Sequence, residues 1–277
     1  MRTESFHTPR QLAVSVKLPR GDIAVETSES DETVVTLDGS GDRTSRQIER
    51  ADVRLENRGD YDELIVDVDP EEITWSAGRL KLAINFDLRK DSVDLHLRVP
   101  HGTILRTATG SADVRAGGRY RQLEMKSGSG DISVDDVEED ATINVASGDV
   151  RIDRVSGSLR LQSAAGDLSV GPVGGDAEVK TAAGDIRLDQ VGGNVSVHSA
   201  SGDVRIGAVS AGRVELKSVS GDMLVGVRRG SRVWMDVKTV TGDASSELEP
   251  GGEDDGEGPL VELKATAMSG DIKIVRA

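Results

Sequence analysis

The stretch that decides the fold runs from Gly148 to Ser210 and reads GDVRIDRVS GSLRLQSAA GDLSVGPVG GDAEVKTAA GDIRLDQVG GNVSVHSAS GDVRIGAVS. It consists of seven consecutive nine-residue units, each beginning with glycine. After one inserted residue the pattern resumes at Gly212 and Gly221, and looser copies begin at Gly242 and Gly270. Upstream, the pairs Gly130-Asp131 and Ala112-Asp113 keep the same spacing. A short fixed period of this kind is typical of a solenoid.

The apolar residues of each unit lie two, four and seven places after the glycine. In the first unit Val150 and Ile152 alternate with Arg151 and Asp153. This period of two is the pattern of a β-strand with one buried face. A helix is disfavoured, because a glycine at every ninth position would cost about 1 kcal/mol each. We therefore predict a short strand followed by a turn in every unit.

The third apolar position indicates that the true period is two units, or 18 residues. It alternates between a larger and a smaller side chain, in the order Val155, Ala164, Val173, Ala182, Val191, Ala200, Val209. An aspartate column has the same period, with Asp131, Asp149, Asp167, Asp185, Asp203 and Asp222. We therefore predict an all-β fold, a parallel β-solenoid with two strands per coil and a rise of about 4.8 Å per coil.

The two ends of the chain depart from the regular repeat. We predict an irregular β-rich N-terminal cap over residues 1–102 and a regular solenoid over residues 103–277, together one continuous domain, with two domains as the alternative. Residues 70–90, which carry Trp75 and Phe86, are expected to leave this pattern. Residues 249–259 predict an acidic loop, because their composition cannot form a core. The strands expected in the cap span residues 12–18, 23–26, 34–37, 53–56, 64–68 and 93–99.

Composition and charge exclude several classes of protein. The chain has 49 acidic and 34 basic residues, a net charge of −15, which argues against a nucleic-acid partner. It has no cysteine, which excludes disulfides and cysteine-ligated metals. The polar opening MRTESFHTPR predicts no secretory signal peptide. No apolar run approaches the roughly 18 residues of a membrane span, so we expect no transmembrane segment and a cytoplasmic location.

No motif in the sequence predicts catalysis. The patterns GxSxG, HExxH, GxGxxG and GxxxxGK are absent, and we expect no enzyme activity, no cofactor and no bound metal. The aspartate column could bind calcium, but the favoured interpretation is that each aspartate accepts N–H groups in its own turn. Two Arg-Gly-Asp tripeptides, at residues 20–22 and 58–60, are expected to be coincidental. The other residues weighed as ligands are His7, His96, His101, His198, Asp67, Asp69, Glu71 and Glu72.

The recurring pattern [SA]-G-D-[VI]-x-[VIL] resembles a bacterial family of adhesin-like β-strand-repeat proteins, domain of unknown function 4097. It is found at residues 147–152, 183–188, 201–206 and 269–274, and the segment Val93 to Pro100 that leads into the first repeat is also similar. The resemblance covers essentially the whole chain. It implies a right-handed single-stranded parallel β-helix and, for some relatives, a link to cell-envelope stress. The family defines no catalytic residues.

These observations predict a non-enzymatic, adhesin-like interaction scaffold with a protein partner that the sequence does not identify. The alternative is a polysaccharide-binding or carbohydrate-active β-helix, with its candidate site near Trp75. We also predict a homo-oligomer formed through the C-terminal coil. The chain ends soon after Ile272 and Ile274, which would leave these two side chains uncovered.

Overall fold

The computed structural model describes residues 1–68, 92–248 and 258–277. The chain divides into two compact units, Met1–Val134 and Asp135–Ala277. The predicted boundary after residue 102 coincides with the start of strand β7 (Thr103–Ser129), inside the first unit. The predicted departure at 70–90 and most of the predicted acidic loop at 249–259 lie outside the described residues.

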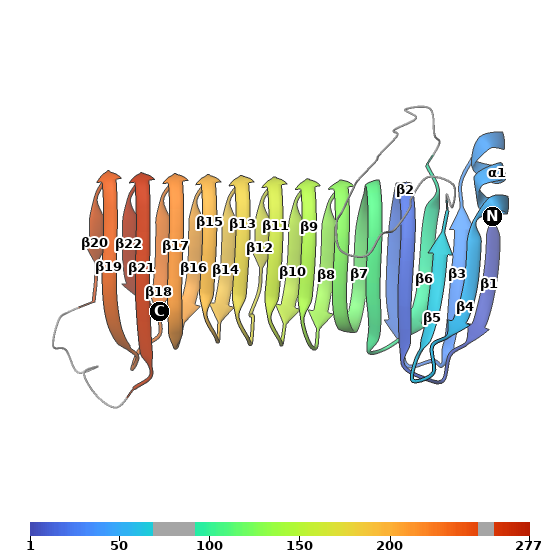
Figure 1. Ribbon diagram of the computed structural model, residues 1–277, viewed down its shortest axis with the longest axis horizontal. Coiled ribbons are helices and arrows are strands. Elements are labelled where there is room, and N and C mark those ends of the chain that lie inside the picture. Colours follow the sequence, from blue (N-terminus) through green and yellow to red (C-terminus); the bar gives the residue numbers. More distant parts are fainter. Residues whose placement is uncertain (69–91, 249–257) are drawn as a thin grey trace. The chain divides into compact units, whose positions relative to one another are not determined.

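The second unit is built from parallel strands in two facing layers (Figure 1). From β9 to β14 each strand pairs with the second strand after it at an offset of 18 residues, as in Leu159↔Ala177 and Ile186↔Val204, and the offset is 19 residues from β15 to β17 and from β16 to β18. The predicted all-β, parallel architecture is confirmed. The strands of the repeat are β8 (Ile132–Val137), which spans the boundary between the units, β9 (Ala141–Ser147), β10 (Val150–Val155), β11 (Leu159–Ala165), β12 (Leu168–Val170), β13 (Ala177–Ala183), β14 (Ile186–Val191), β15 (Val195–Ser201), β16 (Val204–Val209), β17 (Gly212–Ser220) and β18 (Met223–Val227).

The prediction that the alanine column belongs to the core is wrong. The valine corner is buried as expected, at Val155, Val173, Val191 and Val209. The alanine corner is exposed, at Ala164, Ala182 and Ala200. The reason is that β11, β13 and β15 keep alternating for a third inward position, which Ser163, Thr181 and Ser199 occupy. The hydroxyl of Thr181 donates to the backbone oxygen of Ala183 at 3.0 Å, so this inward polar group is satisfied.

The order of the last strands in space differs from their order in the chain. The sequence runs through β19 (Arg232–Thr241) and β20 (Ala244–Ser246) before β21 (Leu260–Ser269) and β22 (Ile272–Arg276). In space β21 lies between β17 and β19, and β22 lies between β18 and β20 (Figure 1). Ile272 and Ile274 are therefore only 0% and 1% exposed. The prediction that they form an uncovered end is wrong, because the strands before them in sequence cover them.

The first unit contains a long strand, β2 (Leu12–Ser28), that is paired along both of its edges. It is parallel to β7 along most of its length, and on its other edge it pairs first with β5 (Asp62–Asp67) and then with β6 (Asp94–Pro100). Three further strands are antiparallel: β3 (Glu32–Asp38) on β6, β1 (Arg2–His7) on β3, and β4 (Asp52–Asn57) on β5. Strands occur at every position predicted for the cap, and antiparallel pairing makes the cap irregular.

A helix, α1 (Asp42–Arg50), was not predicted. It buries only Thr44 and Ile48, one turn apart, and Ile48 is its single apolar residue, so its sequence contains no run of apolar positions at helical spacing. Arg2 holds its C-terminal end, because the Arg2 guanidinium donates to the backbone oxygens of Ile48 and Ala51 at 2.9 and 2.8 Å. No helix in the described part of the chain is long and apolar enough to cross a membrane.

Candidate functional site

The predicted aspartate column forms a ladder of hydrogen bonds between neighbouring coils. The N–H of Asp185 donates to Asp167 Oδ1 at 2.9 Å, and the N–H of Asp203 donates to Asp185 Oδ1 at 2.9 Å. In the first unit Asp131 N–H donates to Asp113 Oδ1 in the same way. In the second unit the ladder runs through Asp149, Asp167, Asp185, Asp203, Asp222, Asp271 and Asp243. Asp271 comes before Asp243 in this ladder because β22, which follows Asp271, lies between β18 and β20.

The favoured interpretation of these aspartates is therefore wrong in one respect. Each carboxylate accepts a backbone N–H, as expected, but the donor lies in the next coil and not in its own turn. Parallel register explains this, because it places equivalent residues beside one another at about 4.8 Å. Among residues 1–68, 92–248 and 258–277 there is no group of three or more His, Cys, Asp and Glu side chains that could hold a metal ion.

A shallow groove of about 960 Å³ crosses the first residues of strands β9, β11, β13, β15, β17 and β21. The backbone at its floor is held by a second set of inter-coil bonds, from Ser158 N–H to Asp140 Oδ1 at 2.8 Å and from Asn194 N–H to Asp176 Oδ1 at 2.7 Å. We call this surface the acidic groove. Its charged lining residues are five carboxylates and two guanidiniums, Asp140, Asp176, Glu178, Glu215, Glu262, Arg160 and Arg213.

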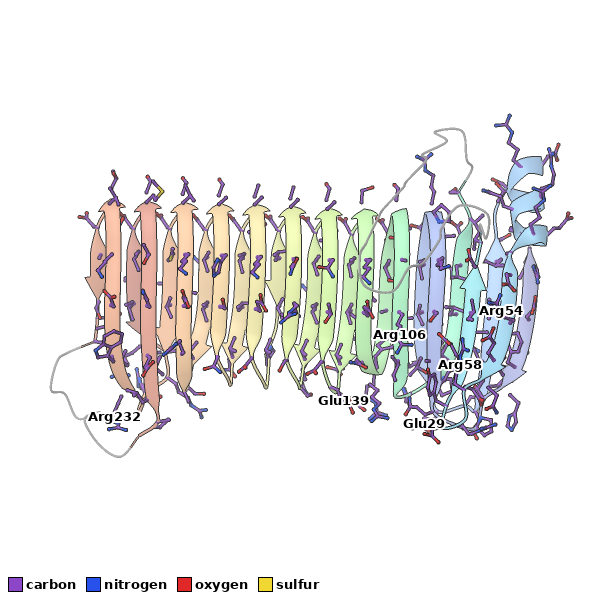
Figure 2. The ribbon with its side chains drawn as sticks, in the orientation of Figure 1. Glu29, Arg54, Arg58, Arg106, Glu139 and Arg232 are labelled. Atoms are coloured by element: carbon purple, nitrogen blue, oxygen red, sulfur yellow. The ribbon has the colours of Figure 1, made fainter. Side chains whose placement is uncertain are left out.

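Two ion pairs join side chains of the acidic groove across neighbouring strands. Arg160 Nη2 lies 2.9 Å from Glu178 Oε2, and Arg213 Nη2 lies 3.2 Å from Glu262 Oε2, each pair joining neighbouring strands. A hydrogen bond from Lys180 and then the charge of Arg160 hold the pKa of Glu178 below its ordinary value. These pairs are largely solvent-exposed and add little stability. Figure 2 shows outward side chains repeating at the same level from strand to strand.

The other residues considered as ligands are dispersed. His96 and His198 lie on outward positions of β6 and β15, as predicted, and His101 Nδ1 is hydrogen-bonded to Thr27 Oγ1 at 2.7 Å. Asp67 lies 3.0 Å from Lys17 Nζ, while Asp69, Glu71 and Glu72 lie outside the described residues. The structure therefore brings no cluster of these residues together in its described part.

The first Arg-Gly-Asp tripeptide has a structural role that the sequence reasoning missed. Gly21 and Asp22 lie beside Ala112 and Asp113 in the β2–β7 register, so they are the turn of one more coil. The signal was present in the sequence Gly-Asp-Ile-Ala-Val at residues 21–25, which matches the repeat. A distance of 91 residues along the chain separates it from the next copy, which is why the fixed spacing did not reveal it.

The fold and these surfaces define a parallel β-solenoid protein with hydrogen-bonded turn columns. Residues 9–275 match the family described as Toastrack DUF4097, and the chain belongs to that family. The resemblance inferred from the repeat is confirmed.

The chain also matches several solved structures over nearly their whole length. They include a candidate adhesin from Bacteroides fragilis (12% identity, 99% of this chain and 96% of that chain, TM-score 0.44). A candidate adhesin from Parabacteroides distasonis is 9% identical over 98% of this chain and 96% of that chain, with a TM-score of 0.40. No curated protein matches the chain.

Proposed function

We propose that this protein is a non-enzymatic, adhesin-like interaction scaffold that binds a partner protein at the acidic groove. The observation that supports this function is the groove itself, whose charged side chains stand on hydrogen-bonded parallel strands. Such a surface presents charges at fixed strand spacing and suits a partner with a matching row of basic side chains. Catalysis would instead need a nucleophile, an acid or a base converging on one point. We further propose that the solenoid coil is right-handed. We also propose that the protein is cytoplasmic and is linked to cell-envelope stress.

The test begins with proteins captured by the full chain and then measures the binding of each purified protein alone. The double variant Glu215→Lys, Glu262→Lys reverses two charges of the groove. The matched control is Asp153→Lys, Asp189→Lys, which makes the same charge change outside the groove, on β10 and β14. We expect binding at least about tenfold weaker in the groove variant and unchanged in the control. Equal effects in both variants, or turnover of any polymer, would contradict the proposal.

The polysaccharide alternative has less support. Its predicted site near Trp75 lies outside the described residues. The groove, within the part of the chain that the structure describes, has no aromatic side chain in its lining on which a sugar ring could stack. Equilibrium binding with acidic and neutral oligosaccharides tests this alternative, and we expect no binding. Cell fractionation tests the cytoplasmic location.

A further inference from the structure

Strand β19 is an edge strand with an incompletely covered core. It pairs with β21 on one side, and no strand of residues 1–68, 92–248 or 258–277 pairs with its other side. Met235 faces inward and is 37% exposed, whereas Leu263, its neighbour in register, is 0% exposed. On the outward face Trp234 and Val240 are 57% and 80% exposed. A long edge with exposed apolar side chains favours pairing with another strand.

The outward side chains of β19 have a symmetrical order. They are Trp234, Asp236, Lys238 and Val240, arranged around Val237. If two copies of β19 pair antiparallel about Val237, Asp236 lies opposite the second copy's Lys238, and the reverse pair forms as well. The same pairing brings Trp234 to the second copy's Val240. Opposite charges and apolar pairs are the cross-strand combinations that stabilise a sheet.

Neighbouring registers lack this match. A pairing centred on Asp236 places two carboxylates opposite each other, and one centred on Lys238 places two ammonium groups opposite each other. A shift of a single residue places outward side chains opposite inward ones, which the two-residue period of a strand forbids. The sequence of β19 therefore favours one register.

The backbone also suits a two-fold axis at Val237. Arg232 N–H donates to Pro259 O at 3.0 Å, on the side of β21. Backbone groups of successive strand residues point to opposite sides, so those of Val237 point to the free edge. Two antiparallel copies can then exchange both N–H···O bonds at Val237.

We propose that two copies of this chain form a two-fold dimer in which β19 pairs with β19 about Val237. The occupant of the free edge is a second copy, because the strand is complementary to itself in charge and in apolar side chains. Two-fold pairing uses the same edge of both copies, so the assembly closes at two. This surface adjoins the end of the acidic groove, where Trp234 lies beside Glu262 in register.

The first measurement is the mass of the full chain in solution at tens of micromolar by light scattering. We expect twice the 29.3 kDa of one chain. A monomer would overturn the proposal. A larger or open-ended assembly would also overturn it.

Charge reversal tests the register. Asp236→Lys and Lys238→Asp each place like charges opposite one another, and each should raise the dissociation constant of the dimer at least about tenfold. An equimolar mixture of the two variants restores opposite charges and should form a heterodimer. The double variant Asp236→Lys, Lys238→Asp should restore the homodimer. Loss of dimer without restoration in the mixture and in the double variant would overturn this register.

The matched control is Lys180→Asp. Lys180 forms an ion pair with Glu178, two residues earlier on the same strand, as Lys238 does with Asp236, but it lies on an inner strand. We expect the control to remain a dimer. Dissociation of the control to the same extent would show that the effect is not specific to the edge, and would overturn the proposal.

Discussion

Asp185 illustrates how one residue of the repeat joins three coils. Its backbone N–H donates to Asp167, and its carboxylate accepts from Asp203. Asp185→Ala removes the acceptor and should lower the free energy of unfolding by about 1 kcal/mol. Asp185→Asn keeps an oxygen at the same position and should cost less. Urea denaturation of both variants measures the difference, and equal losses would mean that the hydrogen bond contributes nothing.

A second residue-scale prediction concerns the glycine before that aspartate. Gly184 has a φ of +113°, and a Cβ there would lie 2.1 Å from the backbone oxygen of Gly166. Gly184→Ala combines this collision with an unfavourable backbone and should cost about 2–5 kcal/mol.

Gly230 provides the matched control for this glycine. It also has a positive φ, +82°, but nothing lies within 4 Å of its Cβ position. Gly230→Ala should therefore cost only about 1–2 kcal/mol. Thermal unfolding compares the two variants, and a similar cost at both positions would show that close stacking of the coils does not select glycine.

At the scale of the element, the strands could be predicted from their own residues, while the order of the last two coils could not. Period-two alternation is local, so the few residues of β10 and of β14 are each enough to predict a strand. The order of the coils depends on comparing distant copies. After Gly242 the inward positions are Ala244 and Ser246, whereas after Gly270 they are Ile272 and Ile274. Terminal repeats of a solenoid are atypical, and this contrast is the signal that the coil at Gly242 is the outer one.

The inserted strands lead to a prediction about truncation. A chain that ends at Leu248 lacks β21 and β22, so β19 and β20 lose the partners they have in the structure. We expect rapid amide hydrogen exchange over residues 232–246, with β17 still protected by β15. Protection of residues 232–246 in the truncated chain would mean that β19 can pair directly with β17, and would contradict this prediction.

At the scale of the whole molecule, each unit is stabilised by contacts between neighbouring coils, and we predict that calcium is not needed for them. The carboxylates of the ladder already accept backbone N–H groups. The melting temperature should therefore differ by less than a few degrees between EDTA and millimolar calcium. A larger increase of the melting temperature with calcium would mean that the aspartate column binds calcium.

Function was less predictable than fold for a physical reason. The buried residues of this chain repeat, and a repeat identifies a solenoid through its period. The acidic groove depends on residues such as Arg160, Glu178 and Glu262, which vary from coil to coil and come together only when the coils stack. The edge at β19 likewise required the spatial order of the strands. Neither surface has a spacing that a motif search could detect.

The insertion of β21 and β22 also has a consequence for protein synthesis. Ribosomes add about 5–20 residues per second, and the N-terminus of the chain emerges first. The regular coils from β9 to β18 can stack one after another as they emerge. The next strands to appear, β19 and β20, have no partner until β21 and β22 have been translated. Their apolar side chains, Trp234 and Met235 among them, lack these partners during that interval, which exposes this segment of the nascent chain to association with a chaperone.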